Sequence, residues 1–143
     1  MVYTSPYPIF AVTADVVLRA PGRRVLLIER AKDPYAGFLA LPGGFVDPDE
    51  DLHEAAAREL AEETGVRVAA DALVQLGAFG HPARDPRGRT VSVVHVLDVD
   101  RELPAVGSDD AAGAGWYDVD GVLAEGRLAF DHADVLHRAF PVS

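Results

Sequence analysis

A short helix with acidic residues on its inner face constrains this chain more than any other feature. Asp51 followed by Glu54 forms a capping-box pattern, and Gly65 is a glycine stop. The sequence therefore predicts a helix over residues 52–64. Because a helix turns by about 100° per residue, its apolar residues fall on one arc. The members of that arc are Leu52, Ala55, Ala56 and Leu60.

Two glutamates lie in the middle of the apolar arc. With Leu52 at zero, Glu59 falls at about −20° and Glu63 at about 20°, whereas Glu62 lies at the margin at about −80°. Glu59 and Glu63 are one turn apart, roughly 6 Å along the helix axis. Carboxylates on a half-buried face repel one another and lose hydration, so they must protonate, pair with a cation or bind a metal.

Two kinds of counter-charge fit these carboxylates. Arg58 and Arg67 would form ion pairs on the helix, which is the usual fate of a run of charges. The other counter-charge is a divalent ion, because carboxylate oxygens beside the Pro42-Gly43-Gly44 turn, which offers a carbonyl, suit magnesium or manganese. The helical wheel alone leaves both alternatives open.

The composition narrows the class of protein. The chain has 143 residues, so we expect one domain over residues 1–143. The formal net charge of −10 predicts no nucleic-acid partner, because phosphates would be repelled. Cysteine is absent, which excludes disulfides and thiolate catalysis and fits a reducing compartment. Without a signal-peptide pattern or the roughly 20 apolar residues of a membrane span, we expect a soluble, cytoplasmic protein with no membrane partner.

The remaining segments predict a mixed α/β fold. Asp131 with Asp134 opens a closing helix that ends before Pro141. The turn-like Pro21-Gly22 separates the first two strands, which therefore form a hairpin. Strands combined with two substantial helices indicate a layered α/β arrangement. The runs rich in β-branched residues that predict strands are residues 9–18, 25–28, 73–79, 90–99 and 116–119.

The segment GFVDPDEDLHEAAARELAEETGV, residues 44–66, resembles the signature of the Nudix hydrolases. Gly44 is followed by five residues and Glu50, and seven further residues lead to Arg58-Glu59. An aliphatic residue, a free position, Glu62-Glu63, another free position, glycine and a second aliphatic residue complete the pattern. Every specified position agrees, so this match is far more specific than a lone glycine motif.

This resemblance implies a fold, a reaction and a site. The fold would be an α/β/α sandwich, and the reaction would be hydrolysis of a nucleoside diphosphate linked to another moiety. Magnesium, or manganese, would be the cofactor. Arg58 would be the internal counter-charge that orients a glutamate, and Glu50 would support the loop beside Gly44. The implied metal ligands are Glu59, Glu62, Glu63 and the carbonyl of Gly43.

Segments outside the signature resemble the ADP-ribose pyrophosphatase group. They are LALPGGFVD before the signature, RDPRGRTVSVV at residues 84–94 and LAFDHADVL at residues 128–136. The resemblance implies ADP-ribose as the substrate, with AMP and ribose 5-phosphate as products. Guanidinium groups suit phosphate oxygens. The candidate substrate contacts are therefore Arg30, Arg84, Arg87 and Arg89.

One departure from the group concerns the general base. Relatives often have a glutamate in the loop before the last strand, where this chain reads DDAAGAGWY, with Gly113 and Gly115 in place of the acid and the base. Asp109 and Asp110 are the nearby substitutes, and a water activated by the metal without a separate base is the alternative. We expect His81, His95, His132 and His137 to be structural or surface residues.

Two other functions stay open. A nucleoside triphosphate hydrolase of the MutT kind is disfavoured by the arginine loop and the LAFDH segment. A non-catalytic ADP-ribose sensor would ordinarily carry a DNA-binding module and a degraded signature, neither of which we expect here, but the missing glutamate keeps that function open. The resemblance also allows a homodimer in which the apolar N-terminal strand makes the contact.

Overall fold

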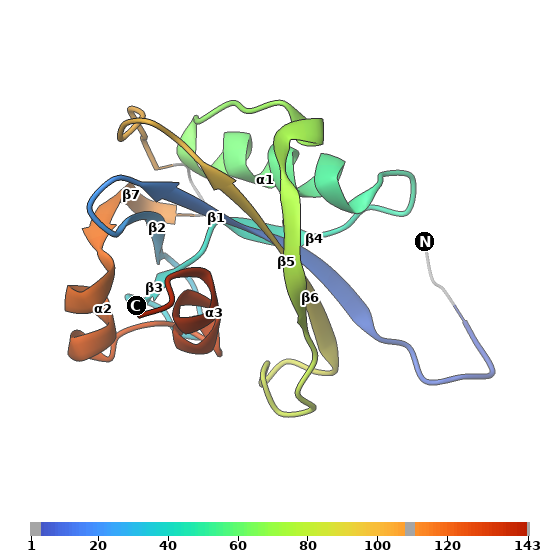
Figure 1. The fold of residues 1–143 in the computed structure, drawn as a ribbon. Helices are drawn as coiled ribbons and strands as arrows, with labels where there is room; N and C mark the ends of the chain where they lie inside the picture. Colours follow the sequence, from blue (N-terminus) through green and yellow to red (C-terminus); the bar gives the residue numbers. More distant parts are fainter. Residues whose placement is uncertain (1–3, 108–110, 143) are drawn as a thin grey trace.

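A computed structural model describes residues 4–107 and 111–142 (Figure 1). The strands are β1 (Ala11–Ala20), β2 (Arg24–Arg30), β3 (Leu39–Ala40), β4 (Gly43–Phe45), β5 (Val74–Phe79), β6 (Thr90–Asp98) and β7 (Ala111–Asp118). The helices in the described residues are α1 (Leu52–Thr64), the 3-10 turn η1 (Ala70–Ala72), α2 (Val119–Glu125) and α3 (His132–Ala139). Of the described strands, four precede α1 and three more precede α2 and α3, so strands and helices occur together in this chain, which confirms the mixed α/β class.

The seven strands of the described residues belong to one mixed sheet. Its main order is β3-β2-β1-β6-β5, and β4 and β7 pair with β1 and β2 respectively. β1 and β6 are parallel over nine residue pairs, whereas the other pairs of named strands are antiparallel. The expected hairpin is present, because β1 and β2 pair across the turn that contains Pro21-Gly22.

Helices cover both faces of the sheet, which confirms the α/β/α sandwich. Figure 1 shows α1 on one face and α2 and α3 on the other. Successive strand residues face opposite sides, so Val16 of β1 packs in the cluster with Leu60 of α1, and Val17 packs in the cluster with Leu136 of α3. None of the described helices has the length and apolar character needed to cross a bilayer.

The sheet opens between β1 and β2, and this opening places the site. The two strands pair only at residues 19–20 and 24–25. Beyond that point β1 pairs with β4 and β2 pairs with β3, so the chain crosses the gap at Leu41-Pro42. Gly43 and Gly44 follow in the extended strand β4, so the expected sharp turn at these glycines is wrong. Both glycines lie in a strand that packs beside α1.

The helix α1 has the bounds that its caps predict. The Asp51 and Glu54 side chains form the capping box, and Gly65 ends the helix at φ 75°. The expected last strand over residues 116–119 is wrong at both ends, because β7 begins at Ala111 and Val119 already starts α2. That unexpected helix is only seven residues long and contains Gly121, so its propensity signal is weak. Its local signal was the cap at Asp118, whose Oδ2 accepts from the Gly121 N–H at 2.8 Å.

His95 on β6 is a buried polar side chain whose ring nitrogens make no hydrogen bond of good geometry with the described residues, although the backbones of Asp15 and Val93 partly oppose the effect of burial on its pKa. It has no exposed surface, and neither ring nitrogen has a hydrogen-bond partner among the described residues. Replacement His95→Leu removes two unsatisfied polar atoms, so we expect the variant to be about 1 kcal/mol more stable at pH 7. The corresponding rise in Tm is about 3 °C, measurable by thermal unfolding.

Acid should enlarge this difference. Burial lowers the pKa of His95, so the unfolded chain takes up a proton at a higher pH than the folded protein does. The wild type therefore loses stability as the pH falls below about 6.5, and the variant lacks this loss. The exposed His137 offers the control, His137→Gln. A stability difference that stays constant from pH 7 to pH 5 for His95→Leu would contradict the assignment.

Candidate active site

A pocket of about 350 Å³ lies where β1 and β2 diverge. Its volume is in the range of small-molecule sites. The strands β1, β2, β3 and β4, the helix α1, the loop before β6 and the start of α3 contribute to it. The lining residues are Thr13, Asp15, Ile28, Arg30, Ala40, Leu41, Gly43, Gly44, Phe45, Asp47, Glu59, Glu63, Arg84, Asp85, Arg87, Phe130 and His132.

Glu63 is a buried carboxylate that faces Gly43. Only 9% of the residue is exposed, and its Oε1 accepts from the Gly43 N–H at 2.7 Å. It makes no ion pair with an arginine or lysine of the described residues. Burial, opposed by the Gly43 hydrogen bond and increased by Glu59 and Asp15, raises the pKa of Glu63 to about 8. Such a group gains from a divalent cation that replaces its proton.

The backbone of Gly43 faces the same point. Gly43 and Asp15 form a pair without mutual hydrogen bonds, because the bonds of the β4–β1 ladder join the flanking residues, such as Val16 N–H to Pro42 carbonyl. The N–H and the carbonyl of Gly43 therefore both point away from β1. The N–H donates to Glu63. The carbonyl of Gly43 lies on the same edge of the strand, where it can serve as a hard oxygen ligand.

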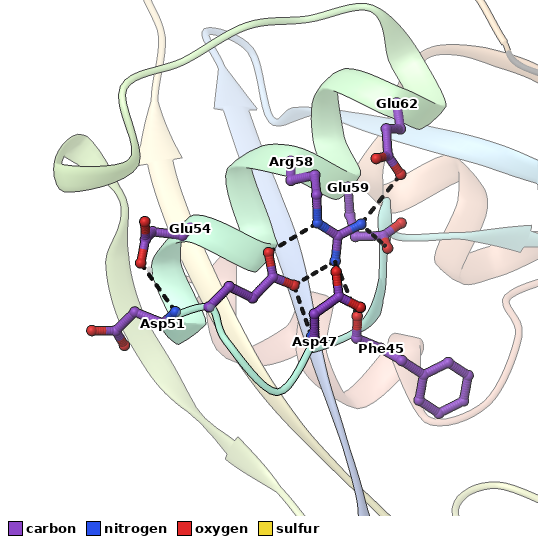
Figure 2. Close-up of polar contacts among 8 residues, drawn as sticks. Phe45, Asp47, Asp51, Glu54, Arg58, Glu59 and Glu62 are labelled. Carbon is purple, nitrogen blue, oxygen red and sulfur yellow. Dashed lines mark hydrogen bonds and ion pairs between the residues drawn. The ribbon is translucent and has the colours of Figure 1, made fainter. Parts of the chain in front are cut away.

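Arg58 connects the carboxylates of the signature (Figure 2). Its Nη2 lies 2.5 Å and its Nε 2.9 Å from the Glu50 carboxylate, and its Nη1 lies 2.8 Å from Glu59. The hydrogen bond from Arg58 lowers the pKa of Glu50, whereas burial raises the pKa of Glu59 despite the same arginine. Arg58 also donates to the Phe45 carbonyl at 3.2 Å. The arginine thus fixes Glu59 against β4 without lining the pocket.

Glu62 lies apart from Glu59 and Glu63. It is exposed, its Oε2 lies 3.3 Å from Arg58 Nη1, and it does not line the pocket. Over residues 4–107 and 111–142, no three Asp, Glu or His side chains are grouped so that they form an ion site by themselves. The donors that do converge are Glu59, Glu63 and the Gly43 carbonyl. This set fits a hard divalent ion that completes its shell with water and phosphate oxygens.

Gly44 leaves room for the Glu59 carboxylate. A Cβ at this position would lie 2.6 to 2.8 Å from the carboxylate atoms of Glu59, and a Cβ on Gly43 would collide with Asp15 Oδ1 and with backbone atoms of Ala14 and Asp15. These two glycines therefore have different roles. Gly44 gives space to the end of a flexible side chain, whereas Gly43 gives space to the neighbouring strand.

The two glycines predict two different variants. Gly44→Ala should fold within about 1 kcal/mol of the wild type. Because it displaces Glu59, it should lose about 10- to 100-fold in affinity for a divalent ion. Gly43→Ala should instead lose about 2 to 3 kcal/mol of folding stability, because backbone atoms must move. Calorimetric titration of the metal and thermal unfolding separate these results, and equal loss of stability in both variants would contradict the distinction.

The four arginines expected at the substrate divide into two groups. Arg30, Arg84 and Arg87 line the pocket. Arg89 does not line it, because its Nη1 donates to the Gly80 carbonyl at 2.6 Å and its guanidinium lies over Phe10. The structure therefore places Arg89 outside the site that the sequence assigned to it.

The three pocket arginines are held by the protein itself. Arg30 Nε donates to the Pro34 carbonyl at 2.7 Å, and Arg30 stacks on Phe130. Arg84 is buried and makes a bidentate ion pair with Asp131, with hydrogen bonds of 2.6 and 2.9 Å. Arg87 pairs with Asp85 in the same way and lies over the rings of Phe45 and Phe130. Their remaining N–H groups are available to an anionic ligand.

The position of the missing acid differs from the expected one. Gly113 lies inside β7, where it pairs with Glu29, so placing it in a loop before the last strand is wrong. Asp109 and Asp110, the candidate bases, lie outside the described residues. The structure therefore leaves both candidates as predictions.

Sequence reasoning did not find several residues that line the pocket. Asp15 and Thr13 of β1, Phe130 and His132 near α3, and Asp85 of the loop were not assigned to the site. One signal was available for Asp15, because a charge in a strand that is otherwise apolar needs a reason for its burial. No local signal marks Phe130, which reaches the pocket through tertiary contacts.

Comparison with known proteins agrees with this geometry. The family model described as NUDIX domain matches residues 9–139. An ADP-ribose pyrophosphatase of Methanocaldococcus jannaschii is 41% identical over 127 residues, which are 88% of this chain and 70% of that protein. An ADPR responsive transcriptional repressor of Acinetobacter baylyi is 33% identical over 95% of this chain and 55% of that protein. Since this relative is a transcriptional repressor, the absence of a nucleic-acid partner stays a prediction.

A solved structure shows the same fold. The NUDIX domain of Shewanella oneidensis NrtR, in complex with ADP ribose, superposes with a TM-score of 0.84 at 30% identity. The alignment covers 95% of this chain and 91% of that one. With the family match over most of its length, the chain belongs to the NUDIX family and is a Nudix hydrolase.

Proposed function

We propose that this Nudix hydrolase cleaves the diphosphate of ADP-ribose, or of a similar nucleoside diphosphate sugar, with magnesium or manganese as cofactor. The products from ADP-ribose are AMP and ribose 5-phosphate. The observation that carries the proposal is the buried Glu63, which makes no ion pair with a described arginine or lysine and lines the pocket together with Glu59 and Gly43. The relative and the solved structure whose names include ADP-ribose support the choice of substrate.

In this proposal each group of the site has a chemical task. A divalent ion supplies Lewis-acid chemistry that neutralises the diphosphate and makes water a better nucleophile. Glu59, Glu63 and the Gly43 carbonyl would hold the ion, and Glu62, now 3.3 Å from Arg58, would be the further carboxylate ligand that the signature supplies. Arg58 keeps Glu59 in place, and Glu50 keeps Arg58 in place. The pocket arginines orient the phosphate oxygens, because guanidinium groups form paired hydrogen bonds with them.

The proposal predicts a preference among nucleotides. With magnesium, the purified protein should release AMP from ADP-ribose with a kcat/KM at least about tenfold higher than for any nucleoside triphosphate. Separation of products by chromatography measures both reactions. If a nucleoside triphosphate were cleaved faster than ADP-ribose, the protein would be a hydrolase of the MutT kind and not an ADP-ribose pyrophosphatase.

A second candidate function is binding of ADP-ribose without cleavage. The similarity to an ADPR responsive repressor and the glycine at position 113 favour it. The same samples test it, because a ligand that binds only the folded state raises Tm. A rise in Tm with ADP-ribose and no release of AMP would establish the sensor and exclude the hydrolase for this substrate.

A further inference from the structure

Asp15 is a buried carboxylate at the floor of the pocket that the metal ligands do not explain. Only 7% of the residue is exposed, and it lines the pocket. Its Oδ2 accepts a short hydrogen bond from the Ser92 hydroxyl on β6. Its Oδ1 accepts no hydrogen bond from the described residues, and no arginine or lysine among them forms an ion pair with it. Oδ1 packs against Gly43, whereas Oδ2 can accept a second hydrogen bond beside the one from Ser92. One acceptor position of Oδ2 is therefore left for the pocket.

His132 places a donor beside this acceptor. Its Nδ1 accepts from the Leu41 N–H at 3.0 Å, so the proton of the neutral ring lies on Nε2. Burial lowers the pKa of His132 to about 4, which keeps the ring neutral at pH 7. Nε2 lies 3.9 Å from Asp15 Oδ2, which is too far for a hydrogen bond. A donor and an acceptor thus face one gap without satisfying each other.

The gap selects one chemical group. A hydroxyl donates one hydrogen bond and accepts another, so it satisfies Asp15 and His132 at once. An amino group of a base only donates, and a phosphate oxygen only accepts and is repelled by the Asp15 carboxylate. An oxygen about 2.8 Å from both groups closes a triangle over the 3.9 Å gap.

We propose that Asp15 and His132 bind a hydroxyl of the sugar that is joined to the nucleoside diphosphate, and that Asp15 selects such sugars over a further phosphate. This inference rests on the proposed function and names the recognition element of the same pocket. The location supports it, because Gly43, the residue that faces Glu63, pairs with Asp15 across β4 and β1. A sugar on the diphosphate therefore lies within reach of this floor once the diphosphate lies at Glu59 and Glu63.

The test compares two substrates that differ only in the sugar. One is ADP-ribose, and the other is the methyl ester of ADP, in which a methyl group replaces the ribose on the second phosphate. The variant is Asp15→Asn, which keeps the size but turns one acceptor into a donor. We expect kcat/KM for ADP-ribose to fall about 30-fold more than kcat/KM for the methyl ester, and this difference to arise in KM.

A second measurement does not depend on turnover. Ribose 5-phosphate should inhibit the wild type, and Asp15→Asn should weaken this inhibition about tenfold while inhibition by AMP is unchanged. Equal losses for both substrates, or for both inhibitors, would overturn the proposal and show that Asp15 supports the fold or the metal end. No change for either substrate would also overturn it. A loss that appears with ADP-ribose and disappears with its inosine analogue would assign Asp15 to the base instead.

A failure of the proposed function can be distinguished from a failure of the sugar-site inference. A wild type that does not cleave ADP-ribose refutes that function before any variant is made. Binding of ribose 5-phosphate, measured by its effect on Tm, then still tests the sugar site. Equal Tm shifts in the wild type and Asp15→Asn would overturn the inference in that case too.

Discussion

Replacement Glu63→Gln is expected to reduce turnover of ADP-ribose by about 10³-fold or more, with the fold intact. A divalent ion contributes several kcal/mol to hydrolysis of a diphosphate, and each 1.4 kcal/mol is a factor of about ten. The amide keeps the size of the side chain and its hydrogen bond from the Gly43 N–H, but it is a far weaker ligand. Steady-state release of AMP measures the loss.

The same variant should change stability in opposite directions with and without metal. The pKa of Glu63 is raised to about 8 in the fold, against an ordinary value of 4.5, so the folded state binds the proton more tightly than the unfolded state. In EDTA the wild type therefore loses stability as the pH rises from about 4.5 towards 8. Glu63→Gln has no such loss and should have the higher Tm at pH 8.

Magnesium should reverse this order. Binding of the ion needs the ionised carboxylate, so its stabilisation of the wild type grows over the same pH range and is absent from Glu63→Gln. The matched control is Glu125→Gln, an exposed glutamate at the end of α2 that is outside the pocket. Equal stabilisation of wild type and Glu63→Gln by magnesium would remove Glu63 from the metal site.

Local signals explain which parts of this fold follow from the sequence. The bounds of α1 depend on contacts within the helix and its caps, namely the Asp51–Glu54 box and Gly65, so the sequence predicts them to the residue. The strand β1 is displaced by two residues from its expected bounds, because strand ends depend on pairing with β6 and β2. The helix α2 was not predicted. Its caps are present, but its span is too short to show a periodic pattern of apolar residues.

The residues of the site also fall into two groups, those that local geometry places and those that tertiary packing places. Glu59, Glu63 and Arg58 belong to one helix, so their relative positions follow from helical geometry. Asp15 and His132 are more than one hundred residues apart in sequence, and their approach depends on the order of the strands and the packing of α3. Arg89 shows the limit for loops, because its direction is set by the Gly80 carbonyl and not by any spacing in the sequence.

The buried pair of Arg84 and Asp131 should have the largest effect on stability. Arg84 Nη2 and Nε bind the two oxygens of Asp131 at 2.6 and 2.9 Å, and only 4% of the arginine side chain is exposed. The pair joins the loop before β6 to the start of α3. Arg84→Met leaves a half-buried carboxylate without its partner, so we expect a loss of about 3 to 5 kcal/mol. For this chain length the fall in Tm is about 10 °C.

The double variant Arg84→Met with Asp131→Leu separates the charge from the packing. Asp131 occupies the N-cap position of α3 but makes no capping hydrogen bond there, so its removal costs the helix little. Without an unpaired charge, the double variant should be more stable than Arg84→Met. Arg23→Met is the partly exposed control, because its pair with Asp120 is much more accessible to solvent than the pair of Arg84 with Asp131 and should contribute less to stability. If Arg84→Met were no more damaging than Arg23→Met, or if the double variant were the least stable, the pair would not be the element that holds the loop against α3.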